Sequence, residues 1–331
     1  MSSLHPVSGE PGEILALLRA WNEADHAEPL VVETSGSTGT AKPVLLSREA
    51  MRASAKATEQ RLGGPGQWLL ALPATYVAGL MVLFRSVVAG TEPILDAGDL
   101  AKSARTMAAD RRYASLVPTQ LARLLETEPE ALRGLDRVLV GGARVEPWLR
   151  TLAGDAGLTV VATYGMSETC GGCVYDGRPL DGVVVSIDDD QRVRIGGPVL
   201  FDGYDGVPRT TDSFLTNDLG RLDDDGTLHV LGRVDDVVIT GGVNVATGAV
   251  AERLREHPAV DEAEVVGVPD PDWGERVVAV IVGDIDLDEA REWVSVVLPR
   301  PWAPRALRTV DEIPLLPNGK VDRQAVEALA R

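Results

Sequence analysis

The 331-residue sequence has few lysines, few cysteines and no long apolar run. Acidic residues outnumber basic ones and give a formal net charge of −18, which argues against nucleic acid or an anionic membrane as a partner. No apolar run approaches the about 18–20 residues that a membrane span needs. Residues 1–12 lack the basic-then-apolar order of a signal peptide. These absences predict a cytoplasmic protein.

Only four of the 32 basic residues are lysine, and the others are arginine. Arginine therefore serves wherever a positive charge is enough. A lysine retained in a glycine-containing loop then indicates a need for a compact, mobile ammonium group. Lys42 and Lys320 both lie in such loops.

The two cysteines, Cys170 and Cys173, form a C-x-x-C pair. A structural zinc site needs four ligands, and no histidine lies near enough in the sequence to complete one. A redox pair is the alternative, but no thioredoxin-like unit surrounds the motif. Packing as small buried side chains is the favoured interpretation.

Buried-looking strands alternate with helical stretches over most of the chain, and this pattern predicts an α/β core with a largely parallel sheet. A short antiparallel region is expected from Gly177 to about Leu231, where Asp/Gly turns dominate. Residues 1–234 would form this large N-terminal domain, and residues 235–331 a small α+β domain that ends in an irregular arm. The expected strands are 67–73, 115–117, 137–140, 159–162, 264–268 and 276–282, and the main helices are 14–21, 47–62, 79–88, 119–126, 248–256 and 287–298.

A stretch rich in glycine, serine and threonine lies between two short apolar runs, 29–32 and 44–46. Backbone N–H groups and hydroxyls of such a loop can wrap a phosphate, and its lysine supplies a point charge. A flexible linker is the alternative, but a linker does not need a lysine between two strands. Ala41 and Pro43 exclude a Walker A loop, which has Gly before the lysine and Ser or Thr after it. The predicted ATP-binding residues here are Thr34, Ser35, Gly36, Ser37, Thr38, Gly39 and Lys42.

Two further segments follow predicted strands. Gly141, Gly142 and Ala143 come after the strand 137–140, where bare backbone lets a flat ring pack; a plain strand-end turn is the alternative. The segment 164–169 follows the strand 159–162, at the end where α/β proteins bind ligands. Its candidate binding residues are Tyr164 for base stacking, Gly165, Ser167, and Glu168 for Mg²⁺, with a turn bearing an exposed acid as the alternative.

Three later motifs are weaker when taken alone. Asp218, at a turn, can accept hydrogen bonds from ribose hydroxyls. The segment 232–245 contains Arg233, a candidate for contact with the nucleotide, and a Gly241-Gly242 pair that could lie along an extended ligand. A common turn between two strands is the alternative interpretation of this segment. Lys320, in an Asn-Gly-Lys turn near the C-terminus, can enter a site only for the step that needs it.

These motifs, in this order from about Pro29 to Arg323, resemble those of the adenylate-forming superfamily of acyl-CoA synthetases, peptide-synthetase adenylation domains and luciferases. Pro43, Ser167 and Asn217 depart from the usual glycine, threonine and glycine. The resemblance implies Mg²⁺ as a cofactor, and ATP and CoA as co-substrates. A carboxylate would attack the α-phosphate of ATP to give an acyl-adenylate and pyrophosphate, and a thiol would then attack the adenylate.

The resemblance also implies roles for individual residues. Lys320, Glu168 and Lys42 would be catalytic, with Glu168 holding the metal. Gly141, Gly142 and Ala143 would lie against adenine, and Arg233 would contact ribose and phosphate. The small domain would be mobile, with its hinge at Asp235, and would rotate to exchange Lys320 for the Gly241-Gly242 loop, which would lie along CoA.

Only 33 residues precede Thr34, whereas superfamily members usually carry well over a hundred there. Short forms of this kind resemble the 2-succinylbenzoate–CoA ligases of menaquinone synthesis in high-GC bacteria. Ligation of another aryl or aliphatic acid, or a catalytically silent nucleotide-binding relative, remain the alternatives. No carrier-protein domain follows Arg331, which disfavours a modular peptide synthetase. A homodimer is a further expectation. The residues expected to wall the acid are Tyr76, Gly79, Thr169, Gly171 and Gly172.

Overall fold

The computed structural model describes residues 6–33, 42–96, 98–315 and 321–331, and the chain divides into two compact units. Unit 1 comprises residues 1–185 and 195–214, and unit 2 comprises residues 186–194 and 215–331. Residues 215–234 therefore cluster with unit 2. The domain boundary and hinge expected near Asp235 stay a prediction, because they concern motion.

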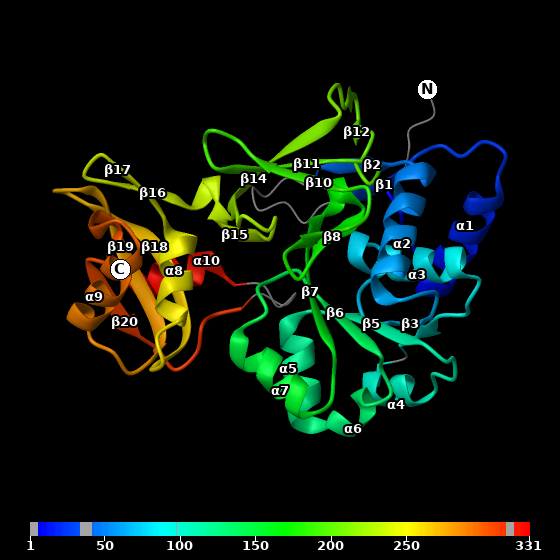
Figure 1. Ribbon diagram of the computed structural model, residues 1–331, viewed down its shortest axis with the longest axis horizontal. Coiled ribbons are helices and arrows are strands. Elements are labelled where there is room, and N and C mark those ends of the chain that lie inside the picture. The colour runs from blue at the N-terminus through cyan, green and yellow to red at the C-terminus, as the bar shows by residue number, and fades with distance from the viewer. Residues whose placement is uncertain (1–5, 34–41, 97, 316–320) are drawn as a thin grey trace. The chain divides into compact units, whose positions relative to one another are not determined.

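Unit 1 is built on a seven-stranded sheet of order β4-β3-β5-β6-β7-β8-β9 (Figure 1). Its first five strands are parallel to one another, β8 pairs antiparallel with β7, and β9 pairs antiparallel with β8. The strands are β3 (Gln67–Leu70), β4 (Ile94–Leu95), β5 (Arg112–Leu116), β6 (Arg137–Val140), β7 (Val160–Met166), β8 (Gly171–Tyr175) and β9 (Arg178–Pro179).

Helices cover both faces of this sheet (Figure 1). One face packs its Leu, Val and Ala side chains against α4 (Leu100–Arg105), α5 (Pro118–Thr127), α6 (Pro129–Leu132) and α7 (Pro147–Asp155). The other face is covered by α2 (Arg48–Leu62) and α3 (Val77–Ala89), with α1 (Pro11–Glu23) against α3. Left-handed glycines, Gly63 and Gly90, end α2 and α3, because glycine adopts positive φ without a Cβ penalty.

A small antiparallel sheet of order β1-β2-β12-β13 completes unit 1. The hairpin of β1 and β2 pairs Glu33 with Pro43, so the residues between them connect two adjacent strand ends. Strand β12 pairs with β2 and places Tyr204 opposite Val44. The strands are β1 (Leu30–Glu33), β2 (Pro43–Leu46), β12 (Gly203–Tyr204) and β13 (Val207–Pro208).

A third, four-stranded sheet has the order β10-β11-β14-β15. These strands are β10 (Val184–Ile187), β11 (Arg192–Gly196), β14 (Ser213–Leu222) and β15 (Leu228–Arg233). Strands β14 and β15 pair antiparallel, as the short strands and Asp/Gly turns of this region predicted.

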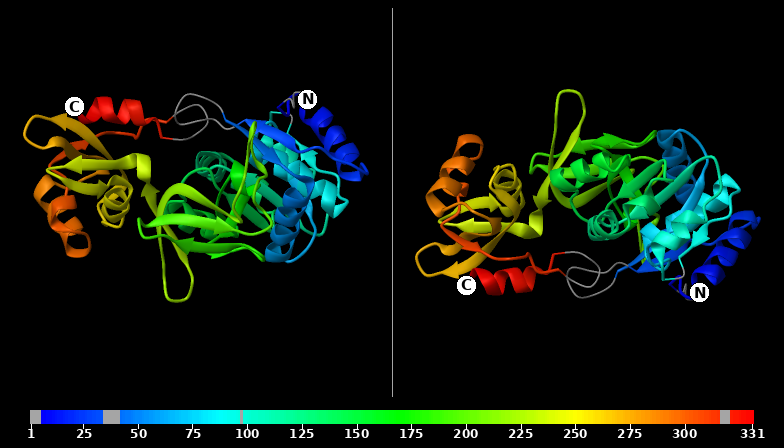
Figure 2. Two further views of the ribbon diagram at one scale, coloured as in Figure 1. Left: turned by 90° about the horizontal axis from the view of Figure 1, so that it is seen from above. Right: turned by 90° about the horizontal axis from the view of Figure 1, so that it is seen from below.

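Unit 2 also contains a five-stranded sheet of order β17-β16-β19-β18, with β20 parallel to β19. Helices α8 (Thr247–Arg255) and α9 (Leu287–Val297) pack on one face, and α10 (Arg323–Ala330) packs on the other (Figure 2). The strands are β16 (Val237–Thr240), β17 (Val243–Ala246), β18 (Val260–Asp270), β19 (Gly274–Gly283) and β20 (Ala306–Thr309). No helix in the described part of the chain is long and apolar enough to cross a bilayer.

The predicted α/β alternation and parallel core are confirmed, but several local predictions are wrong. The strand expected over 67–73 ends at Leu70, and the strand expected over 115–117 is Arg112–Leu116. The strand expected to end at Ala162 continues to Met166, because β8 takes over as hydrogen-bonding partner where β6 ends. The C-terminal arm expected to be irregular ends in α10. Asp322 accepts a hydrogen bond from the Ala325 N–H at its start, and Val326 and Ala330 are buried.

Candidate active site

Three of the segments predicted to bind ligand meet around Thr163 on β7. A Cβ on Gly141 would lie 2.4 Å from the Thr163 hydroxyl oxygen, and one on Gly172 would lie 3.2 Å from the Thr163 Cβ. A Cβ on Gly165 would lie 2.0 Å from the Gly171 carbonyl oxygen. These three glycines are therefore required by close approach of chain to chain. The carboxyl ends of β6 and β7 and the start of β8 adjoin one another.

Glu168 is presented by a tight 3₁₀ turn, Ser167–Thr169. The Thr169 hydroxyl donates to the Gly171 carbonyl at 2.7 Å and accepts from the Met166 N–H at 2.9 Å. Cys170 ends the turn with a left-handed φ of 52°. Thr169 is fully buried, so its hydroxyl shapes the turn beside Glu168.

The Glu168 carboxylate has a partner from a distant part of the sequence. The Tyr204 hydroxyl donates to Glu168 Oε1 at 2.8 Å, and the Phe201 N–H donates to the Glu168 carbonyl at 2.9 Å. Burial, and then the Glu168 charge, raise the pKa of Tyr204 well above its usual value, so the phenol stays protonated and donates. The Lys42 ammonium lies 5.8 Å from the centre of the Tyr204 ring.

These groups fit a magnesium ion. A carboxylate is the hard oxygen ligand that Mg²⁺ prefers, and the Tyr204 bond engages Oε1 of Glu168. Among the described residues no group of three or more His, Cys, Asp or Glu could hold a metal. A magnesium ion here would take its remaining ligands from phosphate oxygens and water, which is its usual behaviour with nucleotides.

The residues predicted to line the acid-binding pocket differ in their exposure and in how closely neighbouring atoms approach them. Tyr76, at the start of α3, is 49% exposed. Gly79 packs α3 against the preceding turn, because a Cβ there would lie 2.3 Å from the Pro73 carbonyl oxygen. Gly171, with φ +84°, has only Met81 Cγ, at 3.8 Å, near its missing Cβ. A Cβ at Gly171 would therefore make only ordinary van der Waals contact with Met81, and the positive φ is what favours glycine there.

Arg85, which the sequence did not single out, is a buried cation on α3. Its exposed fraction is 6%, and its Nε has no hydrogen-bond partner among the described residues. The guanidinium lies over the Trp68 ring, 5.1 Å from its centre. Its charge also acts on the pKa of Cys170, the residue before Gly171. Helix α3, on which Arg85 lies, packs against β3, β5 and β8.

Both cysteines are free and fully buried. Burial raises the pKa of Cys170, and burial raises the pKa of Cys173 to about 12. The neutral thiol is therefore the form present at physiological pH, as expected for cysteines that serve packing.

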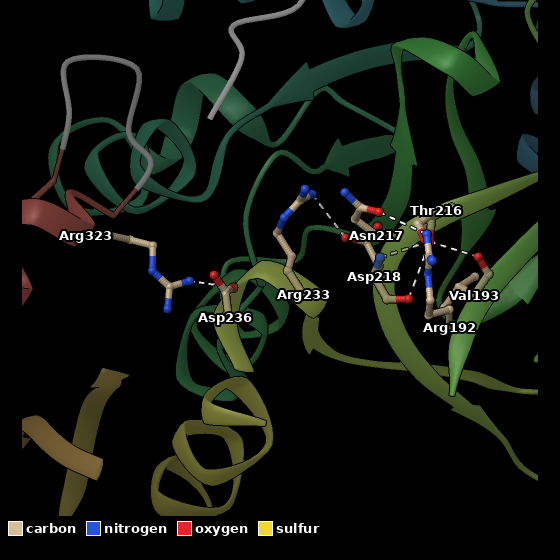
Figure 3. Close-up of polar contacts among 8 residues, drawn as sticks. All are labelled: Arg192, Val193, Thr216, Asn217, Asp218, Arg233, Asp236 and Arg323. Atoms are coloured by element: carbon tan, nitrogen blue, oxygen red, sulfur yellow. Dashed lines mark hydrogen bonds and ion pairs between the residues drawn. The ribbon is translucent and has the colours of Figure 1, made fainter. Parts of the chain in front are cut away.

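In unit 2, Asp218 and Arg233 form an ion pair across β14 and β15 (Figure 3). Arg233 Nη1 lies 3.3 Å from Asp218 Oδ1, and the Asp218 side chain is 11% exposed. Arg192 donates to the Thr216 carbonyl at 2.8 Å and to Asn217 Oδ1 at 3.0 Å. Two residues predicted for ribose are thus held together, and Arg192, missed from the sequence, supports the strand beside them.

The predicted hinge region lies in another 3₁₀ turn, Val234–Asp236. Arg323 Nη1 lies 2.5 Å from Asp236 Oδ2, and this ion pair joins the turn to the start of α10 (Figure 3). Gly241 and Gly242 form the two-residue turn of the β16–β17 hairpin, and both have positive φ, as a type I′ turn requires. The Trp273 ring occupies the space of a Gly241 Cβ.

Some predicted residues lie outside the described part of the chain. They are Thr34, Ser35, Gly36, Ser37, Thr38, Gly39 and Lys320. The side chain of Asp235 is likewise not described. Among the described residues, sequence reasoning missed Tyr204, Arg85 and Arg192. Tyr204 follows an Asp-Gly turn signal, but its contact with Glu168 depends on strand pairing that sequence spacing does not reveal.

Comparison with known proteins gives consistent matches over nearly the whole chain. Residues 26–204 match the AMP-binding enzyme family, and residues 249–320 match the AMP-binding enzyme C-terminal domain. A probable 2-succinylbenzoate–CoA ligase of Mycobacterium tuberculosis is 44% identical over 336 residues, covering 95% of this chain and 87% of that protein.

Two solved structures are similar in fold. The o-succinylbenzoate CoA synthetase (MenE) of Bacillus subtilis, in complex with the acyl-adenylate intermediate OSB-AMP, aligns with a TM-score of 0.73 and 28% identity, covering 90% of this chain and 68% of that one. ATP-bound MatB of Rhodopseudomonas palustris aligns with a TM-score of 0.76 and 25% identity, covering 92% and 69%.

Proposed function

Because the chain belongs to the AMP-binding enzyme family, we propose that it is an ATP-dependent acid–CoA ligase acting on 2-succinylbenzoate in menaquinone biosynthesis. The substrate carboxylate attacks the α-phosphate of ATP to give an acyl-adenylate and pyrophosphate. The thiol of CoA then attacks the adenylate and displaces AMP. A carboxylate is a poor electrophile. The first step converts it to an acyl-adenylate, from which AMP is a good leaving group in the second step.

The observation that carries this proposal is that Glu168 and Lys42 both lie against Tyr204, in a chain so similar to a probable 2-succinylbenzoate–CoA ligase. Tyr204 contacts both residues, so a carboxylate and an ammonium are available together. Lys42 contributes positive charge toward the triphosphate, and Glu168 offers an oxygen to a metal. A bound Mg²⁺ would neutralise phosphate charge during the displacement.

Asp218 and Arg233 are assigned to the ribose and phosphate of the nucleotide. The carboxylate accepts hydrogen bonds from hydroxyl groups, and the guanidinium donates to phosphate oxygen. Their cross-strand ion pair orders both side chains before a ligand arrives. Gly141, Gly142, Ala143 and Tyr164 are assigned to the adenine, because bare backbone at a strand end accepts a flat ring.

Arg85 is assigned to the second carboxylate of 2-succinylbenzoate. A buried guanidinium whose Nε lacks a hydrogen-bond partner is costly, and a substrate carboxylate would satisfy it. Helix α3, which carries Arg85, packs against β8, which begins at Gly171. Monocarboxylic acids cannot make this contact, so Arg85 would favour the dicarboxylate.

The second half-reaction is assigned to a rearrangement of the C-terminal domain about Asp235. Lys320 would act only in adenylation, and the Gly241–Gly242 turn would lie along CoA during thioester formation. Sharing one site between two chemical steps requires such a switch. We also expect a cytoplasmic location, where ATP and CoA are available, and leave a homodimer as a prediction.

The test is pyrophosphate release from ATP on adding 2-succinylbenzoate, followed by thioester formation on adding CoA. Comparison of kcat/KM for 2-succinylbenzoate, benzoate and a medium-chain fatty acid decides the acid. A competitor that matches or exceeds the dicarboxylate would leave only a general acid–CoA ligase. Arg85→Gln should lower kcat/KM for the dicarboxylate by about 10–100-fold and leave benzoate little changed.

A further inference from the structure

Tyr204 is held rigidly by its own segment of unit 1. Strand β12 pairs with β2 on one side and with β13 on the other. Gly203, with φ +141°, permits this close pairing, because a Cβ there would lie 2.4 Å from the Val207 carbonyl oxygen. The Tyr204 ring packs edge-on against buried Phe201, with 5.1 Å between ring centres. The position of the phenol is therefore set before any ligand binds.

The same segment holds Glu168 at two points. The Tyr204 hydroxyl donates to the carboxylate at 2.8 Å, and the Phe201 N–H donates to the Glu168 carbonyl at 2.9 Å. A carboxylate has about four lone-pair positions, so this single bond leaves others available for a metal or its water. The bond fixes the rotamer of Glu168 without using up its capacity as a ligand.

We propose that Tyr204 is a positioning residue for metal–nucleotide binding, acting through its hydroxyl bond to the Glu168 carboxylate. The inference rests on the proposed function, in which Glu168 is a ligand of the metal that accompanies ATP. Without the bond, Glu168 samples several rotamers, and binding must restrict them at a cost in affinity. Hydrogen-bond partners of metal ligands typically change metal affinity by about 10–100-fold when removed.

The test uses Tyr204→Phe, which keeps the ring and its contacts with Phe201 and Lys42. Binding of ATP is measured by calorimetry without any acid substrate, once with Mn²⁺ and once with EDTA. The variant should bind Mn²⁺–ATP about tenfold or more weakly and metal-free ATP with almost unchanged affinity. A structural defect would weaken both equally, and that result, or no change in either, would overturn the inference.

Tyr113→Phe is the matched control. Its hydroxyl also makes hydrogen bonds, to the Leu62 and Gly64 carbonyls, but it lies on β5 with no contact to Glu168 among the described residues. Its removal should leave Mn²⁺–ATP binding unchanged, and a loss equal to that of Tyr204→Phe would contradict a specific role. Failure of the unaltered protein to bind Mn²⁺–ATP would contradict the proposed function and this inference with it.

A double-mutant cycle with Glu168→Asp gives a second measurement. The shorter carboxylate lacks the reach to the Tyr204 hydroxyl. Removal of that hydroxyl in the Glu168→Asp background should therefore have little further effect on Mn²⁺–ATP affinity. Additive losses would show that the two side chains act independently and would overturn the inference.

Discussion

The acidic residues at the predicted site in unit 1 and those at the predicted site and hinge in unit 2 are held by different kinds of side chain. In unit 1, Glu168 is held by a tyrosine hydroxyl and a backbone N–H, beside a turn whose threonine is fully buried. In unit 2, arginine ion pairs hold Asp218 and Asp236, and the side chains of Arg233 and Arg323 are 43% and 40% exposed. Neutral donors hold Glu168, and partly exposed guanidinium groups hold Asp218 and Asp236.

The difference concerns how each set responds to its surroundings. A neutral hydroxyl or N–H donor carries no net charge for salt to screen, so its hydrogen bond can hold a ligating carboxylate in one geometry. Exposed ion pairs are screened by salt and contribute little to stability, so they can break and re-form. The Asp236–Arg323 pair lies in the C-terminal domain that is proposed to rearrange, whereas the Asp218–Arg233 pair precedes the proposed hinge at Asp235.

The largest expected effect is that of Lys320→Ala. Loss of a charge that stabilises the transition state should slow adenylation by about 10²–10³-fold and spare thioester formation from a supplied acyl-adenylate. The two rates are measured separately by pyrophosphate release and by CoA thioester formation. Equal damage to both would remove the basis for treating residues 235–331 as the switching domain.

Asp218→Asn should weaken nucleotide binding by about 10–100-fold, because it removes a buried charge that pairs with Arg233 and is assigned to ribose. Calorimetry with ATP gives the affinity. Asp223→Asn is the matched control, since Asp223 also pairs with an arginine but is not assigned to ligand. Equal losses in the two variants would show that general surface charge, and not the assigned site, is responsible.

The cysteines of unit 1 should make stability depend on alkaline pH. In the folded state burial raises the pKa of Cys170, and that of Cys173 to about 12, from a usual value of 9.0. The stability due to the neutral thiols is complete below pH 9 and is lost as the pH rises toward 12, because only the unfolded chain ionises there. The loss should be about 1 kcal/mol per thiol at pH 10.

Urea unfolding at pH 8 and pH 10 measures this effect. The double variant Cys170→Ala with Cys173→Ser removes both thiols and should show a smaller loss between the two pH values. The same loss in both proteins would assign the pH dependence to tyrosines or other groups. Nucleotide binding of the double variant should be unchanged at pH 8.

The smallest effect is expected from Asn217→Gly, which restores the residue usual in the superfamily. The substitution removes one hydrogen bond from Arg192, while Arg192 keeps its contacts with the Thr216 carbonyl. Nucleotide affinity should change by less than about threefold, within the range of one exposed hydrogen bond. A larger loss would show that Asn217 itself helps to order Asp218.

The local pattern of the sequence predicted most of the fold. Strand β6 and the helices α2 and α9 lie within one residue of the expected ranges, because periodic apolar residues and end signals such as Gly63 act over a few residues. The sequence-based prediction of element ends was wrong where a strand or helix depends on elements that pack against it from elsewhere in the chain. The end of β7 depends on which strand pairs with it, and α10 is stabilised by the sheet that buries Val326.

The sequence by itself determined the order of the motifs and the residue types that chemistry needs at Lys42, Glu168 and Asp218. Only the tertiary structure brought Tyr204 to Glu168 and left Arg85 buried on α3 without a partner for its Nε among the described residues. It also showed that Gly165 and Gly172 serve chain packing. The physical reason is range: propensity and turn chemistry act between neighbours in sequence, whereas hydrogen bonds and burial depend on residues that folding brings together.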